Sequence, residues 1–106
     1  MKIGLISDIH GNFTALNAVL EDISKHEVDC IICLGDVATI CPQPGEVLAK
    51  LQEIDCVCIL GNHEEALLDM ESALDYQIAP ALIPALYWCL DKLQQEDLTY
   101  LSGFKY

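Results

Sequence analysis

Three short apolar runs, each followed at once by polar residues, constrain the fold of this chain more than any other feature. The runs are residues 3–7, 30–34 and 56–60, and they are rich in Ile, Leu, Val and Cys. Nearly continuous apolar runs of this length are typical of strands buried on both faces of a parallel sheet. The sequence therefore predicts three parallel strands.

The two intervals between these runs have helical periodicity. In the first interval, apolar residues recur at helical spacing from Ala15 to Ile23, with charged residues on the other side. In the second, a periodic apolar set follows Pro44, which suits the first turn of a helix. The predicted order is β-α-β-α-β, an α/β parallel sheet with helices and right-handed crossovers.

The rest of the chain is predicted to be helical. Ala66, Leu67 and Met70 fit one helix face, Pro84 can open another helix, and a short last turn covers residues 95–101. We expect Tyr87 and Trp88 to lie in the core or an interface. No repeat or linker is visible, so residues 1–106 are expected to form a single domain.

Charge and composition exclude some functions. The formal net charge is −12 with only five Lys and Arg residues, which argues against nucleic-acid binding but suits a protein that holds cations. No run approaches the roughly 18 apolar residues of a membrane span, and no signal-peptide pattern is visible, so we expect a cytoplasmic protein. The apolar content of 53% is high for a small domain and predicts apolar surface that needs a covering partner.

The six cysteines are interpreted as reduced residues, mostly of the core. Cys30 and Cys33 have CxxC spacing, but residues three apart on a strand point to opposite faces and cannot share a metal ion. Cys56 and Cys58 lie in the third apolar run and have the same interpretation. Cys41 and Cys89 carry no interpretable signal.

Polar clusters lie directly after all three predicted strands, at residues 7–12 (SDIHGN), 35–36 (GD) and 61–64 (GNHE). In open parallel sheets, ligands bind beyond the carboxyl ends of the strands, so the clusters are expected to meet in one crevice. Each alone is typical of an ordinary turn or helix cap. Their joint placement indicates a shared site.

The residue types in these clusters favour a two-metal centre. If strand geometry continues through Ile9, then Asp8 and His10 leave the chain on one face and can bind one cation together. Asp36 has two oxygens that could bridge two cations, and Asn62 offers an amide oxygen. A mixed oxygen and imidazole set suits manganese, iron or zinc, while magnesium prefers oxygen alone.

Two divalent ions could clamp a phosphoryl group and lower the pKa of a bridging water, which would then attack as hydroxide. His63 is placed to protonate a leaving oxygen or to stabilise charge on the phosphoryl group. His26 is expected at the surface near a helix end. Glu64 and Glu65 are expected to act as favourable helix N-terminal charges rather than as ligands.

These clusters resemble the calcineurin-like metallophosphoesterase superfamily, whose pattern runs Asp-x-His, Gly-Asp, Gly-Asn-His-Asp/Glu, a separate His, and Gly-His-x-His. The first three blocks match in order and spacing, and the likeness to the small bacterial and archaeal phosphoesterases extends over essentially all 106 residues. The resemblance implies that Asp8 and His10 bind the first metal, Asp36 bridges, Asn62 binds the second and His63 is the catalytic acid. Two metal ions are implied, with manganese favoured over iron, zinc, nickel or magnesium.

The chain departs from this pattern in two places. His63 is its last histidine, so the later histidine blocks have no counterpart. Residues 39–42 (TICP) stand where the small phosphoesterases usually have glycines, and they lack the arginine of the serine/threonine phosphatase branch. The resemblance thus implies a partial domain, the amino-terminal half of a four-layer αββα sandwich, with one sheet face exposed and poor activity on its own.

Two functions fit these observations. The first is a truncated or split phosphoesterase that acts on a phosphate mono- or diester and associates with a separate carboxy-terminal half or with a second copy of itself. The alternative is a non-catalytic interaction module that keeps the half-fold. A phospho-acceptor receiver fits poorly, because the first predicted strand ends in Asp-x-His rather than in paired acids.

Overall fold

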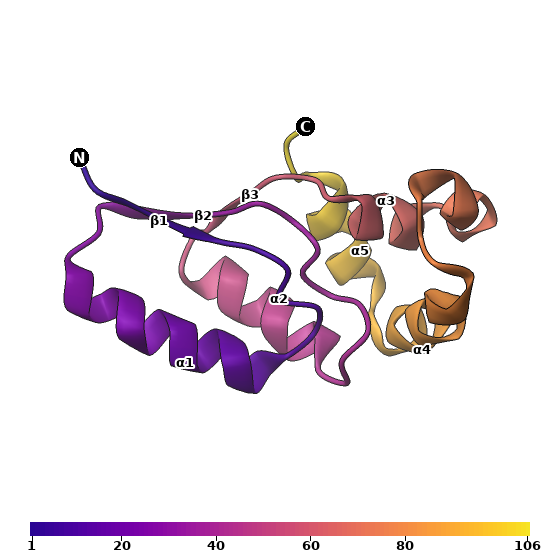
Figure 1. Ribbon diagram of the computed structural model, residues 1–106, viewed down its shortest axis with the longest axis horizontal. Helices are drawn as coiled ribbons and strands as arrows, with labels where there is room; N and C mark the ends of the chain where they lie inside the picture. The colour runs from indigo at the N-terminus through magenta and orange to yellow at the C-terminus, as the bar shows by residue number, and fades with distance from the viewer.

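The computed structural model describes residues 1–106 and contains one parallel sheet with helices on one side (Figure 1). The sheet order is β1-β2-β3, and Ile3 of β1 pairs with Cys30 of β2. Cys33 of β2 pairs with Cys58 of β3. The strands are β1 (Ile3–Ile6), β2 (Cys30–Cys33) and β3 (Val57–Cys58). The predicted α/β fold with three parallel strands is confirmed.

Helices α1 and α2 cover one face of the sheet (Figure 1). Asn12 caps α1 by accepting a hydrogen bond from the N–H of Ala15 at 3.0 Å, and Pro44 opens α2 as predicted. Helices α3, α4 and α5 lie together beyond the carboxyl end of β3 (Figure 1). The helices are α1 (Phe13–Ile23), α2 (Pro44–Glu53), α3 (Asn62–Leu68), α4 (Ile83–Lys92) and α5 (Gln95–Ser102), with short 3-10 turns η1 (Ser24–His26), η2 (Met70–Tyr76) and η3 (Pro80–Leu82).

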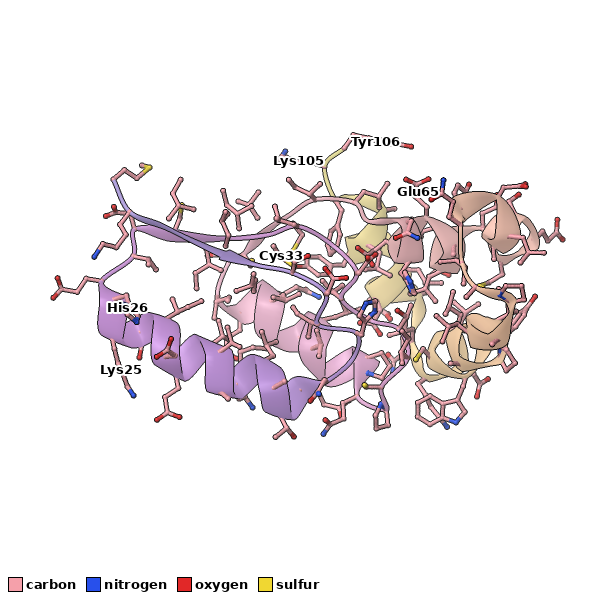
Figure 2. The ribbon with its side chains drawn as sticks, in the orientation of Figure 1. Lys25, His26, Cys33, Glu65, Lys105 and Tyr106 are labelled. Atoms are coloured by element: carbon pink, nitrogen blue, oxygen red, sulfur yellow. The ribbon has the colours of Figure 1, made fainter.

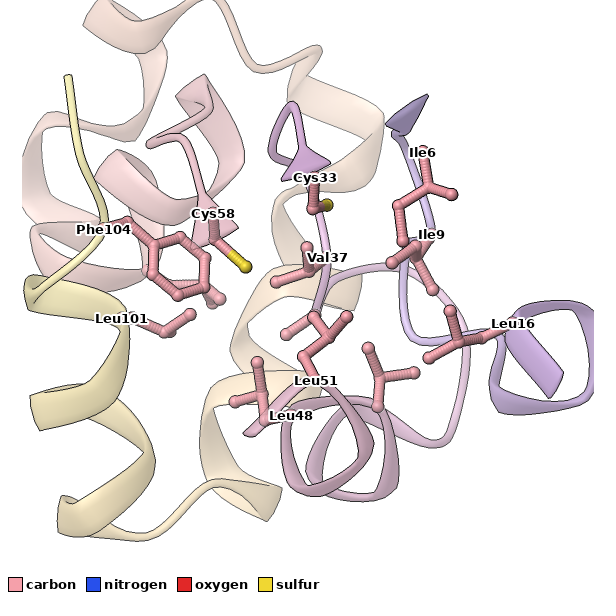
Figure 3. Close-up of a cluster of buried hydrophobic side chains, with 13 residues drawn as sticks. Ile6, Ile9, Leu16, Cys33, Val37, Leu48, Leu51, Cys58, Leu101 and Phe104 are labelled. Carbon is pink, nitrogen blue, oxygen red and sulfur yellow. The ribbon is translucent and has the colours of Figure 1, made fainter. Parts of the chain in front are cut away.

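The main core lies between the sheet and the helices (Figure 3). Cys33 of β2 and Leu48 and Leu51 of α2 are completely buried there, and Leu101 of α5 closes the cluster beside Phe104. A second, smaller cluster joins α3, η2 and α4 around Leu86. Both clusters fix the carboxyl ends of the strands relative to α3, where the polar residues lie.

The opposite face of the sheet is open. Ile3 and Leu5 of β1 are 46% and 63% exposed, and Val57 of β3 is 44% exposed. The prediction of strands buried on both faces is therefore wrong for this chain, because no second layer covers this face. The exposed sheet face that the family resemblance implied is observed.

The last residues of the chain extend the sheet edge, which the sequence did not predict. The N–H of Lys105 donates to the carbonyl of Cys58 at 3.0 Å, and the N–H of Leu60 donates to the carbonyl of Lys105 at 2.6 Å. Ile59 and Lys105 thus form a parallel bridge. The Cys58 carbonyl at the outer edge of β3 is therefore hydrogen-bonded.

Some sequence expectations need correction. Tyr87 and Trp88 are 52% and 45% exposed and do not belong to the core; Lys92 lies over the Trp88 ring at 5.1 Å. Cys30 is exposed while Cys33 is buried, which confirms their opposite faces but removes Cys30 from the core. None of the helices is both long and apolar enough to span a bilayer.

Candidate metal centre

The first polar cluster is a loop rather than a continuation of β1. The strand ends at Ile6, and Asp8 and His10 both have left-handed backbone conformations, with φ of 56° and 50°. The strand geometry expected through Ile9 is therefore wrong. The two side chains still approach each other, because the tight loop brings His10 Nε2 to 3.4 Å from Asp8 Oδ1.

Backbone hydrogen bonds align this loop with the one after β2. The N–H of Asp8 donates to the carbonyl of Gly35 at 3.0 Å, and the N–H of His10 donates to the carbonyl of Asp36 at 3.0 Å. A third bond joins Gly11 to Val37 at 2.8 Å. The first two loops therefore stay paired beyond the regular sheet, and this pairing sets the relative positions of His10 and Asp36.

Asp36 connects the second loop to the third. It also has a left-handed conformation, with φ of 61°, and such strained non-glycine residues concentrate at functional sites. Its Oδ1 atom accepts a hydrogen bond from the backbone N–H of His63 at 3.0 Å. The carboxylate is thereby held beside the first turn of α3.

Glycines make this close approach of the second and third loops feasible. A Cβ atom on Gly61 would lie 2.8 Å from the backbone nitrogen of Asp36 and even closer to its Oδ1 atom. Gly35 has φ of 109°, which an L-residue rarely adopts, and a Cβ there would lie 2.8 Å from the nitrogen of Gly61. Both glycines are required by contact or conformation.

Three of the five predicted site residues converge closely. Potential ligand atoms of His10, Asp36 and His63 all lie within 4.8 Å of one another. The rings of His10 and His63 meet edge to face with centroids 4.8 Å apart. Asp8 lies beside His10 but is largely exposed, at 63% of its side chain.

Asn62 is the first residue of α3, and its side chain is bonded outside this cluster. Its Nδ2 atom donates to the backbone carbonyl of Tyr76 at 2.9 Å, and the residue is exposed. This hydrogen bond uses only the amide nitrogen, so the Asn62 side-chain oxygen stays free to accept or to bind a cation. His26 lies at the far end of α1, away from α3, and its exposed ring confirms the expected surface position (Figure 2).

Thr39 joins the two clustered histidines, which sequence reasoning did not foresee. Its Oγ1 atom lies 3.0 Å from His10 Nδ1 and 2.7 Å from His63 Nδ1. Thr39 is completely buried. The only sequence signal was that a threonine stands in a segment where the resembled family usually has glycines.

Glu64 is a second residue whose role was only partly predicted. Its carboxylate is completely buried and accepts backbone hydrogen bonds from Asp36 at 2.7 Å, Val37 at 3.1 Å and Gly61 at 3.1 Å. As expected, it stabilises the start of α3 rather than pointing into the ligand cluster. In addition, it ties the loop after β2 to the loop after β3. Burial raises its pKa to about 7, while the N–H donors oppose that shift.

The local environment shifts the pKa of two site residues in the same direction for different reasons. The hydrogen bond from Ser7 lowers the pKa of Asp8, which keeps this carboxyl ionised. Burial lowers the pKa of the His63 imidazole, although the nearby Asp36 carboxylate opposes that shift. The ionised state of Asp8 is the one that a metal ion requires of a carboxylate ligand.

The donor set fits a divalent metal ion. Two imidazoles and one carboxylate come together at the carboxyl edge of a parallel sheet, and a second, ionised carboxylate lies next to them. A cleft of about 390 Å³ adjoins this edge between β1 and α1, and Asp8 and Asn12 line it. Neither Asp36 nor His63 lines that cleft, so it is a neighbouring hollow and not the centre itself.

Comparisons with known proteins agree with this arrangement. The family described as calcineurin-like phosphoesterase matches residues 1–103. The uncharacterized protein MJ0912 of Methanocaldococcus jannaschii is 38% identical over 101 residues, which are 95% of this chain and 41% of that protein.

Solved structures show the same fold. A metallophosphoesterase from Sphaerobacter thermophilus superposes with a TM-score of 0.77 at 33% identity, covering 98% of this chain and 41% of that one. A protein provisionally named a diadenosine tetraphosphatase superposes with a TM-score of 0.74 at 25% identity, covering 96% of this chain and 42% of that one. The chain thus spans about two fifths of the length of the relatives it matches.

Proposed function

Because this chain belongs to the calcineurin-like phosphoesterase family, we propose that it supplies the amino-terminal metal-binding part of an enzyme that hydrolyses phosphate mono- or diesters. The observation that carries the proposal is the convergence of His10, Asp36 and His63 within 4.8 Å at the carboxyl edge of the sheet. Residues far apart in sequence meet there, and their side chains are ones that bind divalent metals.

Each residue has a distinct role in this proposal. Asp8 and His10 would hold the first metal ion, and Asp36 would offer its carboxylate to both ions. Asn62 binds the second ion through its amide oxygen, the atom that the hydrogen bond to Tyr76 leaves free. The 3.4 Å separation between His10 and Asp8 supports the first pair.

Two bound divalent ions would supply positive charge for the phosphoryl group and a water of lowered pKa. We infer manganese as the metal, with iron, zinc, nickel or magnesium as alternatives, because the ligands mix carboxylate and amide oxygens with imidazole nitrogens. His63 donates a proton to the leaving oxygen or a hydrogen bond to the phosphoryl oxygens. The hydrogen bond of 3.0 Å from the His63 backbone N–H to Asp36 Oδ1 holds His63 beside the Asp36 carboxylate.

The ligands of this chain do not saturate two metal ions. Four candidate ligand residues are too few for two ions, so we propose that 1–106 is a partial domain and that further ligands come from a carboxy-terminal half or from a second copy of the chain. The open sheet face, with Leu5 63% exposed, is the surface that such a partner would cover. We further propose that the protein acts in the cytoplasm.

A hydrolysis assay with matched variants tests this proposal. The chain is assayed with Mn²⁺ on an aryl phosphate and an aryl phosphodiester, alone and after coexpression with the part of the Sphaerobacter thermophilus protein that this chain does not cover. We expect poor turnover by the chain alone, a gain of at least about 100-fold in the mixture, and loss of that gain in Asp36→Asn. Efficient turnover by the chain alone that Asp36→Asn abolishes would contradict the need for a partner.

Asp55→Asn provides a matched control. Asp55 is exposed and, like Asp36, has a left-handed backbone, with φ of 52°, so both changes keep a residue that tolerates this conformation. Equal activity of the two variants in the mixture would contradict a metal-bridging role for Asp36.

The exposed apolar face also supports the alternative function, a non-catalytic interaction module. In that case the same face would bind a protein partner and no variant of the metal centre would change the binding. Mn²⁺-independent partner binding together with no hydrolysis in any mixture would favour this alternative.

A further inference from the structure

A single buried hydroxyl connects the two histidines of the metal centre. Thr39 Oγ1 lies 3.0 Å from His10 Nδ1 and 2.7 Å from His63 Nδ1, and no other side chain or backbone group shares it. The threonine has no exposed surface, so water does not compete for these bonds. Both distances are those of true hydrogen bonds.

Counting protons limits how this bridge can form. A threonine hydroxyl donates one hydrogen and accepts through its oxygen, and a neutral imidazole carries its proton on one nitrogen only. When both rings are neutral, the arrangement that satisfies every buried group has one Nδ1 donating to Thr39 while the other accepts from it. Two rings with their protons on Nε2 would leave one of the contacts with no proton, and two rings with their protons on Nδ1 would both donate to the oxygen and leave the buried Thr39 O–H with no acceptor.

We propose that Thr39 is a positioning residue that couples the tautomers of His10 and His63, and that metal binding to His10 thereby places the proton of His63 on Nε2. The inference rests on the proposed function in assigning His10 as a ligand and His63 as the residue that donates a hydrogen bond to the phosphoryl oxygens. It adds a way in which metal binding at His10 determines which nitrogen of His63 carries the proton.

The direction of the bridge follows from what His10 Nε2 contacts. Without a metal ion, this atom lies 3.4 Å from the exposed carboxylate of Asp8, which favours a proton on it. His10 Nδ1 then accepts from Thr39, and His63 Nδ1 donates to Thr39.

The direction reverses when His10 Nε2 binds a metal ion. The only proton of the neutral ring is then on Nδ1, and a metal-bound histidine ordinarily donates that second N–H to a neighbouring acceptor. Thr39 accepts this N–H and turns its own O–H toward His63 Nδ1. His63 must now carry its proton on Nε2, on the side of the ring that does not contact Thr39.

Long-range proton–nitrogen NMR of the imidazole rings tests the coupling directly, since it reports which nitrogen carries the proton. The chain has three histidines, and His26→Asn removes the exposed one to simplify assignment. Spectra are recorded for the wild type, Thr39→Ser and Thr39→Val, without metal and with the diamagnetic ion Zn²⁺. Thr99→Val, in α5 and outside the centre, is the control for the same substitution.

We expect opposite tautomers at His10 and His63 in the wild type and a reversal of both when Zn²⁺ is added. Thr39→Ser should keep this behaviour, whereas in Thr39→Val the His63 tautomer should no longer respond to Zn²⁺. We also expect Zn²⁺ affinity to fall about 10- to 100-fold in Thr39→Val and to stay within about twofold in Thr39→Ser and Thr99→Val.

The outcomes separate this inference from the proposed function. The same tautomer at both rings of the neutral wild type would overturn the coupling, even if Thr39→Val failed to fold. A Zn²⁺ response at His10 Nε2 with an unchanged His63 would overturn the metal-driven reversal and leave the metal centre standing. No Zn²⁺ response at His10 would contradict the metal centre and, with it, the reversal.

Discussion

At the scale of single residues, Glu64 has the largest structural task near the centre. Its carboxylate is completely buried and satisfies three backbone N–H groups, which belong to the loops after β2 and β3. Without it, these donors would be buried with no acceptor, and each such group costs about 1–3 kcal/mol. Glu64 thus holds the backbone of Asp36 in place from outside the cluster of His10, Asp36 and His63.

Replacing Glu64 should therefore destabilise the chain in a graded way. We expect Glu64→Gln, which keeps one acceptor oxygen and the volume, to lower the free energy of unfolding by about 1–3 kcal/mol. Glu64→Ala removes both oxygens and should lose at least about 3 kcal/mol, a large part of the stability of a small domain. Urea denaturation followed by circular dichroism measures both.

Glu65→Gln is the control for these variants. Glu65 is adjacent in α3 but only half-buried, and its side chain accepts no hydrogen bond. It should change the free energy of unfolding by no more than about 0.5 kcal/mol. If Glu64→Gln and Glu65→Gln proved equally stable, the clamp assigned to Glu64 would be wrong.

The sequence located most of the candidate site but not its detailed geometry. Asp8, His10, Asp36, Asn62 and His63 were predicted to meet because the ends of parallel strands share an edge. Ligand atoms of His10, Asp36 and His63 do lie within 4.8 Å of one another, and Asp8 lies 3.4 Å from His10. The approach of Asn62 to this cluster stays a prediction. The left-handed loop at Asp8 and His10 was not predicted, since apolar runs do not show where a strand ends and a turn begins. The bridge by Thr39 depends on a buried contact between loops, which has no periodic sequence signal.

At the scale of elements, the three loops after the strands form one unit. The loops after β1 and β2 pair through backbone hydrogen bonds, and the loop after β3 contacts the second through glycine. The interloop distance at Gly61 is so short that no side chain fits between it and Asp36. The contacts between these loops, more than any single side chain, set the distances between the candidate ligands.

Adding one methyl group at Gly61 should disturb this unit. Its backbone, with φ of −89° and ψ of 170°, suits any residue, so the effect of Gly61→Ala comes from contact with Asp36 alone. We expect a loss of about 1–3 kcal/mol in unfolding free energy, measured by thermal or urea denaturation, and weaker Mn²⁺ binding.

Gly45→Ala is the matched control, because a Cβ atom there meets nothing within 4 Å. Gly45 lies in the first turn of α2, where alanine favours the helix by up to about 1 kcal/mol. This variant should be as stable as the wild type or more so. A Gly61→Ala variant with unchanged stability and Mn²⁺ affinity would show that the loops do not pack as tightly as described.

The order of the elements was predictable, and their lengths were less so. Continuous apolar runs predicted the strands and helical periodicity predicted α1 and α2, and Pro44 marked the start of α2 as expected. β3 has only two residues, and just beyond it Ile59 donates its N–H to the carbonyl of Cys33 in β2 and forms a bridge with Lys105. A contact between residues so distant in sequence cannot be inferred from local patterns.

At the scale of the whole molecule, one layer of helices covers one face of the sheet and leaves the other bare (Figure 1). The exposed side chains of this face, Ile3, Leu5, Leu34 and Val57, are 44–63% accessible. Covering one such side chain stabilises an association by about 1.5–3 kcal/mol when burial is complete. The chain therefore has a surface suited to a partner layer.

We expect the purified chain to self-associate through this face when no other partner is present. Leu5→Thr combined with Val57→Thr should weaken the self-association at least about tenfold, as measured by analytical ultracentrifugation. Leu74→Thr is the control, because Leu74 in η2 is 64% exposed, close to the 63% of Leu5, but lies off the sheet. A chain that stays monomeric, or that responds equally to both changes, would contradict a role for the sheet face.

Calorimetric titration with Mn²⁺ tests the central claim, that loops after three neighbouring strands build one metal centre. The wild type should bind Mn²⁺, and Asp55→Asn should bind it with the same affinity. Asp36→Asn should bind it at least about tenfold more weakly, because Asp36 lies between the first and third loops. Absence of Mn²⁺ binding by the wild type, or equal affinities of all three proteins, would contradict the account.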